Sequence, residues 1–192
     1  MGNHASVIHC LRNIGFRVRL SADISVLNET DVLIIPGVGA FPTAMKALHH
    51  KGLVGYLQQQ ARDQHPIIGI CLGMQVLASA SYEFEYTAGL DIIPGEVVSM
   101  PEGKWHIGWN SLEVFSPESS LQSSDGELFY FNHSFFFRGP NEYQIGLTRY
   151  PNPFAAVIRR NMTVGIQFHP EKSQEAGHVL LASLIMELAN NA

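Results

Sequence analysis

One cysteine, Cys71, lies in a glycine-flanked segment that constrains the fold of the chain more than any other feature. An apolar run typical of a buried strand, residues 66–68, leads directly into Gly-Ile-Cys-Leu-Gly at 69–73. A nucleophile on a tight strand-to-helix turn needs small neighbours, because the backbone is strained there and other segments approach closely. Gly69 and Gly73 meet this need, so the segment predicts a nucleophile elbow with the Cys71 thiol as the attacking group.

A helix is expected to follow the elbow, over residues 72–80. Its amino end would point at the sulfur of Cys71 and favour the thiolate, which is the reactive form of cysteine. A buried core cysteine ahead of a helix would leave the same pattern in the sequence. The choice between these two interpretations depends on residues elsewhere in the chain.

A base and an acid follow a second predicted strand near the carboxyl end. Residues 163–168 form an apolar run that ends at His169-Pro170-Glu171. Enzymes with α/β folds display their reactive groups at strand ends. His169 is suited to accept the thiol proton, and Glu171 to hold the imidazole in one tautomer. Alone, each is more simply a solvated surface residue, but together with the elbow they predict a Cys-His-Glu triad.

A third apolar run, residues 32–35, ends in a glycine-rich turn at 36–41. Such a turn exposes backbone N–H groups. An acyl-transfer enzyme needs two donors aimed at its oxyanion, and the second would be the N–H of Leu72, the residue after the nucleophile. A phosphate-binding loop is disfavoured, because neither G-x-x-x-x-G-K-[ST] nor G-x-G-x-x-G occurs here.

Five segments together carry a family resemblance, namely Pro-Gly-Val-Gly-Ala-Phe (36–41), Gly-Ile-Cys-Leu-Gly-Met-Gln (69–75), His-Ile-Gly-Trp-Asn (106–110), Tyr-Phe-Asn-His-Ser (130–134) and Gln-Phe-His-Pro-Glu-Lys-Ser (167–173). The chain resembles the class I (triad) glutamine amidotransferases, and among them the glutaminase subunits of imidazole glycerol phosphate synthase. The elbow and the His-Pro-Glu segment are shared by the whole group. The resemblance implies a flavodoxin-like α/β fold, with a mostly parallel sheet, flanking helices and an antiparallel flank.

The resemblance also implies a reaction, hydrolysis of glutamine to glutamate and ammonia by Cys71, His169 and Glu171. The oxyanion hole would be formed by Leu72, Gly37, Val38 and Gly39. In relatives, the residue matching Gln75 and the backbone of the segment matching His133 and Ser134 bind the amino-acid part of glutamine. The alternatives are an ordinary helix-surface amide for Gln75 and a hydrogen-bonded core histidine for His133. Neither a cofactor nor a metal is implied.

A partner is implied as well, because ammonia released into water would be lost. In relatives it passes through a channel to a (β/α)₈-barrel cyclase, which makes imidazole glycerol phosphate and aminoimidazole carboxamide ribotide in histidine biosynthesis. Trp109 matches an interface anchor and Lys172 a residue that faces the partner. A core or half-buried aromatic is the alternative for Trp109, and a solvated charge is the alternative for Lys172.

Other functions remain open on the sequence alone. A paralogous glutaminase that feeds a surface-sugar amidinating synthase would keep every catalytic residue. An inactive, partner-binding remnant would explain a truncated amino terminus. A stand-alone cysteine peptidase or hydrolase ranks last, because the Gln75 match and the Pro-Glu-Lys-Ser segment have no place in it.

Charge and cysteine content narrow the classes of partner and compartment. The formal net charge is −5 and no run of Lys or Arg occurs, which argues against nucleic acid and anionic membranes. Two cysteines, Cys10 and Cys71, make no disulfide framework and suit a reducing compartment. No stretch has the pattern of a signal peptide or membrane span. A cytoplasmic protein is expected.

The hydrophobic pattern indicates one amidotransferase domain over residues 1–192, with alternating helices and strands. A first helix is predicted around Cys10, followed by helices over 43–53 and 53–64 with Gly52 between them. Residues 90–146 favour a mixed or antiparallel flank. A closing helix is expected to pack an apolar stripe onto the sheet, formed by Val179, Ala182, Ser183 and Met186.

The amino-terminal end departs from the family pattern. Relatives begin with a buried strand that leads into Asp-Tyr-Gly-Met-Gly-Asn, whereas this sequence starts at Met1-Gly2-Asn3. The usual first strand is therefore expected to be missing. A parallel sheet that loses a strand has unpaired ladder groups, at a cost comparable with a typical stability of roughly 5 to 15 kcal/mol. We expect the natural start to lie upstream, which intact-mass analysis of the native protein would test.

Overall fold

The computed structural model describes residues 3–115 and 120–191 of the chain. Its centre is a six-stranded sheet with the strand order β1-β2-β12-β11-β10-β7. The strands β1 (Leu33–Gly37), β2 (Ile67–Cys71) and β12 (Thr163–Ile166) run parallel to one another. Every residue of β2 and β12 is buried, as expected for parallel strands covered on both faces. This parallel half confirms the predicted α/β fold, with β1 at one edge.

The other half of this sheet is antiparallel and is built from β11 (Pro153–Arg160), β10 (Gln144–Arg149) and β7 (Glu113–Val114). A four-stranded sheet comprises β4 (Thr87–Ala88), β3 (Ala80–Ser81), β5 (Glu96–Ser99) and β9 (Phe135–Arg138). A two-stranded antiparallel sheet pairs β6 (His106–Ser111) with β8 (Leu128–His133). The mixed flank expected over residues 90–146 is thereby confirmed.

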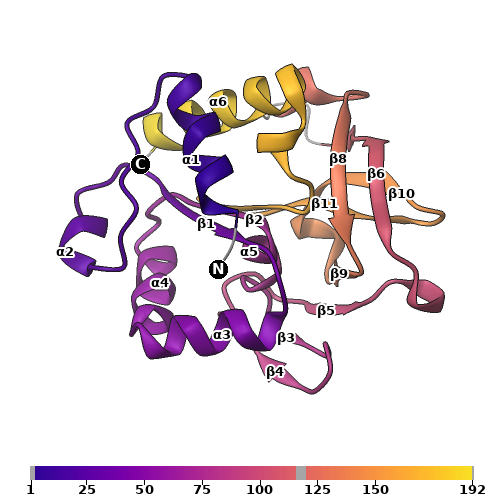
Figure 1. Ribbon diagram of the computed structural model, residues 1–192, viewed down its shortest axis with the longest axis horizontal. Coiled ribbons are helices and arrows are strands. Elements are labelled where there is room, and N and C mark those ends of the chain that lie inside the picture. Colours follow the sequence, from indigo (N-terminus) through magenta and orange to yellow (C-terminus); the bar gives the residue numbers. More distant parts are fainter. Residues whose placement is uncertain (1–2, 116–119, 192) are drawn as a thin grey trace.

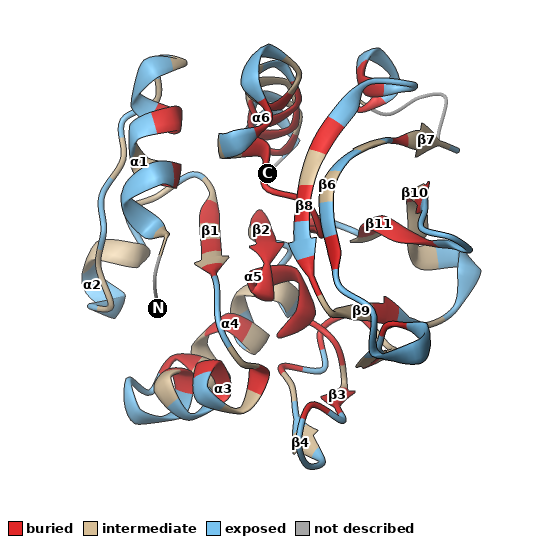
Figure 2. Cartoon of the chain, turned by 45° about the vertical axis from the view of Figure 1, so that its right-hand side comes forward, coloured by how far each residue is buried: buried red, intermediate tan, exposed pale blue. Residues whose placement is uncertain are grey.

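Helices cover both faces of the parallel strands (Figure 1). On one face lie α1 (His4–Asn13) and α6 (Gln174–Asn190), and on the other lie α3 (Phe41–His50) and α4 (Leu53–Arg62) (Figure 2). Short helices complete the chain, namely α2 (Ile24–Leu27), α5 (Leu72–Gln75), η1 (Pro101–Gly103), η2 (Gln122–Ser124), η3 (Asn141–Tyr143) and η4 (Pro170–Lys172). None of the described helices has the length and apolar character needed to cross a bilayer.

Side-chain alternation divides the core into two apolar clusters, one on each face of the parallel strands. Ile68 and Ile70 pack with α1 and α6, whereas Ile67 on β2 packs with α3 and α4. Cys10 is buried on α1 between Val7 and Leu11, as its spacing predicted. The helices α3 and α4 also match their predictions, and Gly52 separates them with φ 68°.

The helix after the elbow is shorter than predicted. The prediction extended it to residue 80, but α5 ends at Gln75 and residues 76–79 form turns and bends. The carbonyl groups of Val76, Leu77 and Ala78 accept hydrogen bonds from the N–H groups of residues 90–93. These long-range bonds take the place of helical ones, so tertiary contacts end the helix after one turn.

The predicted buried face of the closing helix is wrong. Val179 is 40% exposed and Met186 58% exposed, and Ala182 and Ser183 are only partly buried. The buried face consists of Gly177, Leu180, Leu181, Leu184, Ile185 and Leu188. Apolar residues surround most of α6, so periodicity alone did not single out one face. The face rich in Leu and Ile removes more apolar area from water, and it is the one that packs on the sheet.

Candidate active site

Cys71 lies at the junction of β2 and α5, in the predicted elbow geometry. Its backbone angles are φ 55° and ψ −110°, a region that residues with a Cβ rarely occupy. A Cβ added to Gly73 would lie 1.7 Å from the carbonyl oxygen of Ile35, and one added to Gly69 would lie 2.4 Å from the Gly73 carbonyl oxygen. The requirement for small residues on both sides of Cys71 is confirmed.

The glycine-rich turn after β1 lies beside this elbow. Gly37 pairs with Cys71 in the register of β1 and β2. A Cβ added to Gly37 would lie 3.1 Å from the Leu72 Cβ. Gly37 and Leu72, both predicted for the oxyanion hole, are therefore in contact. Val38 is 37% exposed, and Gly39 has a φ of 109° that turns the chain toward α3. The structure therefore places Gly37, where this turn begins, against Leu72, and Val38 and Gly39 follow it in the chain.

Glu83, which the sequence analysis did not predict as a site residue, contacts the end of this turn. Glu83 is buried, and its Oε2 accepts a hydrogen bond of 2.7 Å from the backbone N–H of Phe41, the first residue of α3. A carboxylate is favourable at the amino end of a helix. The surrounding sequence, Tyr-Glu-Phe-Glu-Tyr at 82–86, has the alternation of an exposed segment and gave no signal of this contact.

His169 and Glu171 meet Cys71 at the same edge of the sheet. The His169 Nδ1 lies 2.8 Å from Glu171 Oε1, and the Cys71 side chain is close enough to the same ring to raise the pKa of His169. The backbone N–H of His169 donates to the carbonyl of Tyr130, which fixes the base relative to β8. Both side chains are almost fully buried, at 2% and 0% exposure. The three residues predicted from separate motifs therefore lie together, with His169 hydrogen-bonded to Glu171.

The buried pair is charged at neutral pH. Burial alone would lower the pKa of His169, but its interactions with Cys71 and Glu171 outweigh burial and raise that pKa to about 9. Burial opposes ionisation of Glu171, but the hydrogen bond and charge of His169 prevail and lower the pKa of that carboxyl. A protonated imidazole stabilises a neighbouring thiolate and is ready to donate a proton to a leaving amine.

Gln75 is a buried residue and not the helix-surface amide that was the alternative. Its Nε2 donates to the Phe135 carbonyl at 2.9 Å and to Gln167 Oε1 at 3.2 Å. The Nε2 of Gln167 in turn lies 3.9 Å from the Cys71 sulfur. Gln167 was not predicted as a site residue. It is a polar residue in an apolar run, and the sequence did not indicate which way its side chain points.

The comparison with known families shows which family the chain belongs to. The family model described as "Glutamine amidotransferase class-I" matches residues 1–187. The chain belongs to this family. Its curated relatives include "Imidazole glycerol phosphate synthase subunit HisH" of Streptococcus gordonii, which is 41% identical over 180 residues, or 92% of this chain and 87% of that protein. The protein of the same name from Carboxydothermus hydrogenoformans is 38% identical over 187 residues, or 96% and 94% of the two chains.

Solved structures support the fold of this class I glutamine amidotransferase. A structure described as a glutamine amidotransferase has a TM-score of 0.78 at 19% identity and covers 98% of this chain and 95% of its own. A second glutamine amidotransferase, from Thermotoga maritima, has a TM-score of 0.64 at 18% identity, with coverage of 91% and 83%. Identities this low show the fold alone, and the fold prediction is confirmed by them.

Two buried histidines, His106 on β6 and His133 on β8, lie opposite each other, and their hydrogen bonds define their tautomers. His133 Nδ1 donates to the Phe135 carbonyl at 2.9 Å, which leaves Nε2 to accept from Nδ1 of His106 at 3.1 Å. Nε2 of His106 then faces the amide of Asn110 at 3.4 Å. His133 matches its alternative as a hydrogen-bonded core histidine, while Ser134, half-buried beside it, accepts the Met100 N–H through its carbonyl.

This pair should make the protein sensitive to acid. Burial lowers the pKa of His133 to about 3 and that of His106 to about 4. The unfolded rings have a pKa near 6.5, so they bind protons first as pH falls, and the stability contributed by the neutral pair is lost below about pH 6.5. Between pH 7 and pH 4.5 the free energy of unfolding should fall in both proteins. We expect the fall to be smaller in His133→Gln than in the wild type, by roughly 2 kcal/mol. Urea unfolding at both pH values measures this, and equal losses would contradict it.

Trp109 and Lys172 share one surface, which we call the β6–β8 face and define by Ile107, Trp109, Tyr130 and Lys172. Ile107 is 56% exposed and Trp109 47% exposed. The Trp109 and Tyr130 rings lie 6.0 Å apart, and the Lys172 Nζ lies 5.8 Å from the Tyr130 ring centre. Trp109 is therefore on a strand at the surface and not in the core. Within the described parts of the chain, no three His, Cys, Asp or Glu side chains are arranged to hold a metal.

Proposed function

We propose that this chain is the glutaminase subunit of an imidazole glycerol phosphate synthase. The observation that carries the proposal is the buried Cys71-His169-Glu171 group in a chain about 40% identical to HisH subunits over nearly its whole length. The family membership supports the chemistry, and the HisH relatives support the pathway.

In the proposed reaction, the Cys71 thiolate attacks the side-chain carboxamide carbon of glutamine and forms a carbon–sulfur bond. The backbone N–H of Leu72 and the turn of Gly37, Val38 and Gly39 stabilise the negative charge that develops on the oxygen. The protonated ring of His169 gives its proton to the amine as the carbon–nitrogen bond breaks, and ammonia leaves.

The resulting thioester is then hydrolysed. Neutral His169 takes a proton from water, the hydroxide adds to the thioester carbon, and the carbon–sulfur bond breaks to release glutamate and Cys71. Glu171 holds the His169 ring in both steps through the 2.8 Å contact at Nδ1. Gln75 and the backbone near His133 and Ser134 are proposed to bind the amino-acid part of glutamine. Neither Cys10 nor Cys71 forms a disulfide bond, which suits the cytoplasmic location that is part of this proposal.

The proposed partner is a (β/α)₈-barrel cyclase that binds the β6–β8 face. The face combines exposed apolar side chains with the Lys172 charge, a composition suited to a polar-rimmed protein interface. It is also close to the chemistry, because the Tyr130 carbonyl accepts the His169 N–H. A surface-sugar synthase would be an alternative partner for the same triad. The hydrogen bond between His169 and Glu171 disfavours the inactive-remnant interpretation.

The proposed cyclase partner can be tested by activity and by binding. We expect glutamate release to be strongly stimulated by a histidine-pathway cyclase with its nucleotide ligand, and Trp109→Ala to weaken cyclase binding by tenfold or more, as for a central aromatic anchor. Glutamate assays and titration calorimetry measure the two effects. Phe84→Ala is the matched control, because Phe84 is 86% exposed in the β3–β4 loop outside this face. Absence of stimulation by the cyclase would contradict the proposed pathway.

A further inference from the structure

Asn3 contacts the acid of the triad from the opposite end of the chain. Its Nδ2 donates a hydrogen bond of 2.5 Å to Glu171 Oε1 and lies 3.5 Å from Nδ1 of His169. Asn3 therefore reaches the same carboxylate oxygen that holds the base. The other oxygen, Oε2, is buried without a partner in the described parts of the chain. The orientation of Glu171 thus depends on the contacts at Oε1.

The side chain of Asn3 does not cap helix α1, although Asn3 is at the N-cap position. Asn3 is the N-cap residue of α1, where an asparagine side chain usually accepts a hydrogen bond from the first turn and stabilises the helix. No such bond is present for Asn3. The amide points instead to Glu171, so a local stabilising interaction is replaced by a contact 168 positions away in sequence.

The backbone at this position restricts which residue can make the contact. Asn3 has φ 72° and ψ −2°, in the left-handed region that Gly, Asn and Asp occupy most readily. Glycine has no side-chain donor, and an aspartate would place a second negative charge against Glu171. Asparagine is the residue of this group that combines the backbone conformation with a neutral N–H donor.

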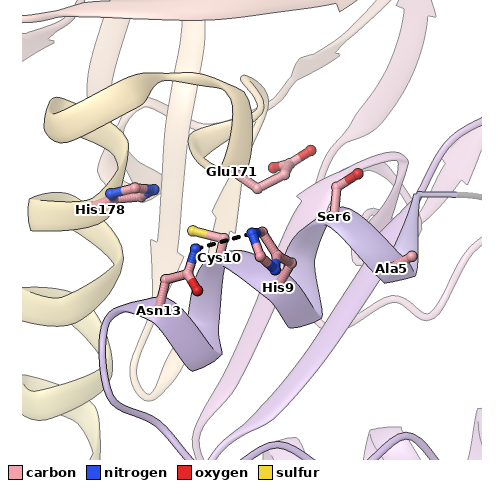
Figure 3. A pocket seen from close by; sticks show the side chains of 7 residues that line it. All are labelled: Ala5, Ser6, His9, Cys10, Asn13, Glu171 and His178. Carbon is pink, nitrogen blue, oxygen red and sulfur yellow. Dashed lines mark hydrogen bonds between the residues drawn. The ribbon is translucent and has the colours of Figure 1, made fainter.

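The surroundings hold Asn3 in place relative to the triad. The buried residues Val7, Cys10 and Leu11 fix α1 against the core. Glu171 lies directly beside α1, where both border a cavity of about 450 Å³ that also contacts α6 (Figure 3). Asn3, at the start of α1, donates a hydrogen bond to Glu171, so its amide links this helix to the acid of the triad.

We infer that Asn3 is a positioning residue, which fixes Glu171 so that Glu171 in turn orients and charges His169. This inference rests on the proposed glutaminase function. The electrostatics agree with the geometry, because the Asn3 hydrogen bond adds to His169 in lowering the pKa of Glu171 against the effect of burial. Without the amide, Glu171 would ionise less readily and turn more freely. The proton on His169 would then be held less tightly.

The test uses the glutaminase in complex with its cyclase and compares wild type, Asn3→Gly and Ser6→Ala. Asn3→Gly keeps the left-handed backbone and removes only the donor, whereas Ser6→Ala is a matched change on the same helix. For Asn3→Gly we expect kcat to fall tenfold or more, KM to change less than threefold, and the alkaline limb of the pH–rate profile to move to lower pH by about half a unit or more. Ser6→Ala should match the wild type in all three.

A second readout does not depend on turnover. Titration of the His169 ring by NMR should show a lower pKa in Asn3→Gly than in the wild type. Asn3→Asp should not shift the pKa downward, because it adds negative charge near the ring. An active wild type with unchanged kcat, pH profile and His169 titration in Asn3→Gly would overturn the positioning role. A loss of activity with an unchanged pH profile and titration would overturn it as well, since that is the result of a purely structural role. A wild type that releases no glutamate would instead refute the proposed function.

Discussion

Cys71→Ala should abolish glutamate release from glutamine and leave the chain folded. Loss of the nucleophile removes the covalent path, so we expect kcat to fall by at least about 10³-fold in the complex with a cyclase. The thiol is small and 6% exposed, so its replacement by a methyl group should change the folded structure little. Glutamate assays measure the activity, and circular dichroism melting checks the fold.

Cys10→Ala is the matched control for this result. Cys10 is the other free, buried cysteine, and burial followed by the charge of Glu171 raises the pKa of its thiol. It therefore stays a thiol at neutral pH and should be unreactive. We expect Cys10→Ala to keep wild-type activity within a few-fold. Residual activity in Cys71→Ala within tenfold of the wild type would show that Cys71 is not the nucleophile.

Gly73→Ala should cause a large loss of stability. The added methyl group would lie 1.7 Å from the Ile35 carbonyl oxygen. Ile35 is held in β1 by its pairing with β2, so the clash cannot be relieved without moving a strand of the central sheet. We expect the free energy of unfolding to drop by more than about 4 kcal/mol, a large part of a typical total of about 5 to 15 kcal/mol. Urea or guanidinium unfolding measures this drop.

Gly55→Ala is the control for that experiment. Gly55 lies within α4, and a Cβ added there meets no atom within 4 Å. Alanine favours a helix over glycine by about 0.5 to 1 kcal/mol, so this variant should be slightly more stable than the wild type. If Gly73→Ala were as stable as Gly55→Ala, the tight elbow packing would be wrong.

The meeting of Cys71, His169 and Glu171 could be predicted because its signals are local. Cys71 and the His-Pro-Glu segment each follow an apolar run, and strand ends in a parallel sheet meet at one edge. The glycines beside Cys71 also indicated close packing, which the distances from their added Cβ atoms confirm. These conclusions needed only residue types and short spacings, which a sequence contains directly.

Other parts of the site depend on hydrogen-bonding partners that are distant in sequence, and the spacing of residues in the sequence does not reveal them. Asn3 stands where a helix cap is expected, and only the fold shows that its amide reaches Glu171. Glu83 and Gln167 gave no signal, because a buried polar side chain in a strand or turn resembles an exposed one until its partner is known. The length of α5 was likewise decided by hydrogen bonds from residues 90–93.

By itself, therefore, the sequence determined the fold class, the elbow and the residues proposed for the triad, since periodicity and backbone strain act over a few positions. Only the tertiary structure decided which face of α6 is buried, where α5 ends, how His133 and His106 pair, and that Asn3 holds Glu171. The physical reason is that hydrogen bonds and burial are set by whichever groups the fold brings together, and those groups lie up to 168 positions apart.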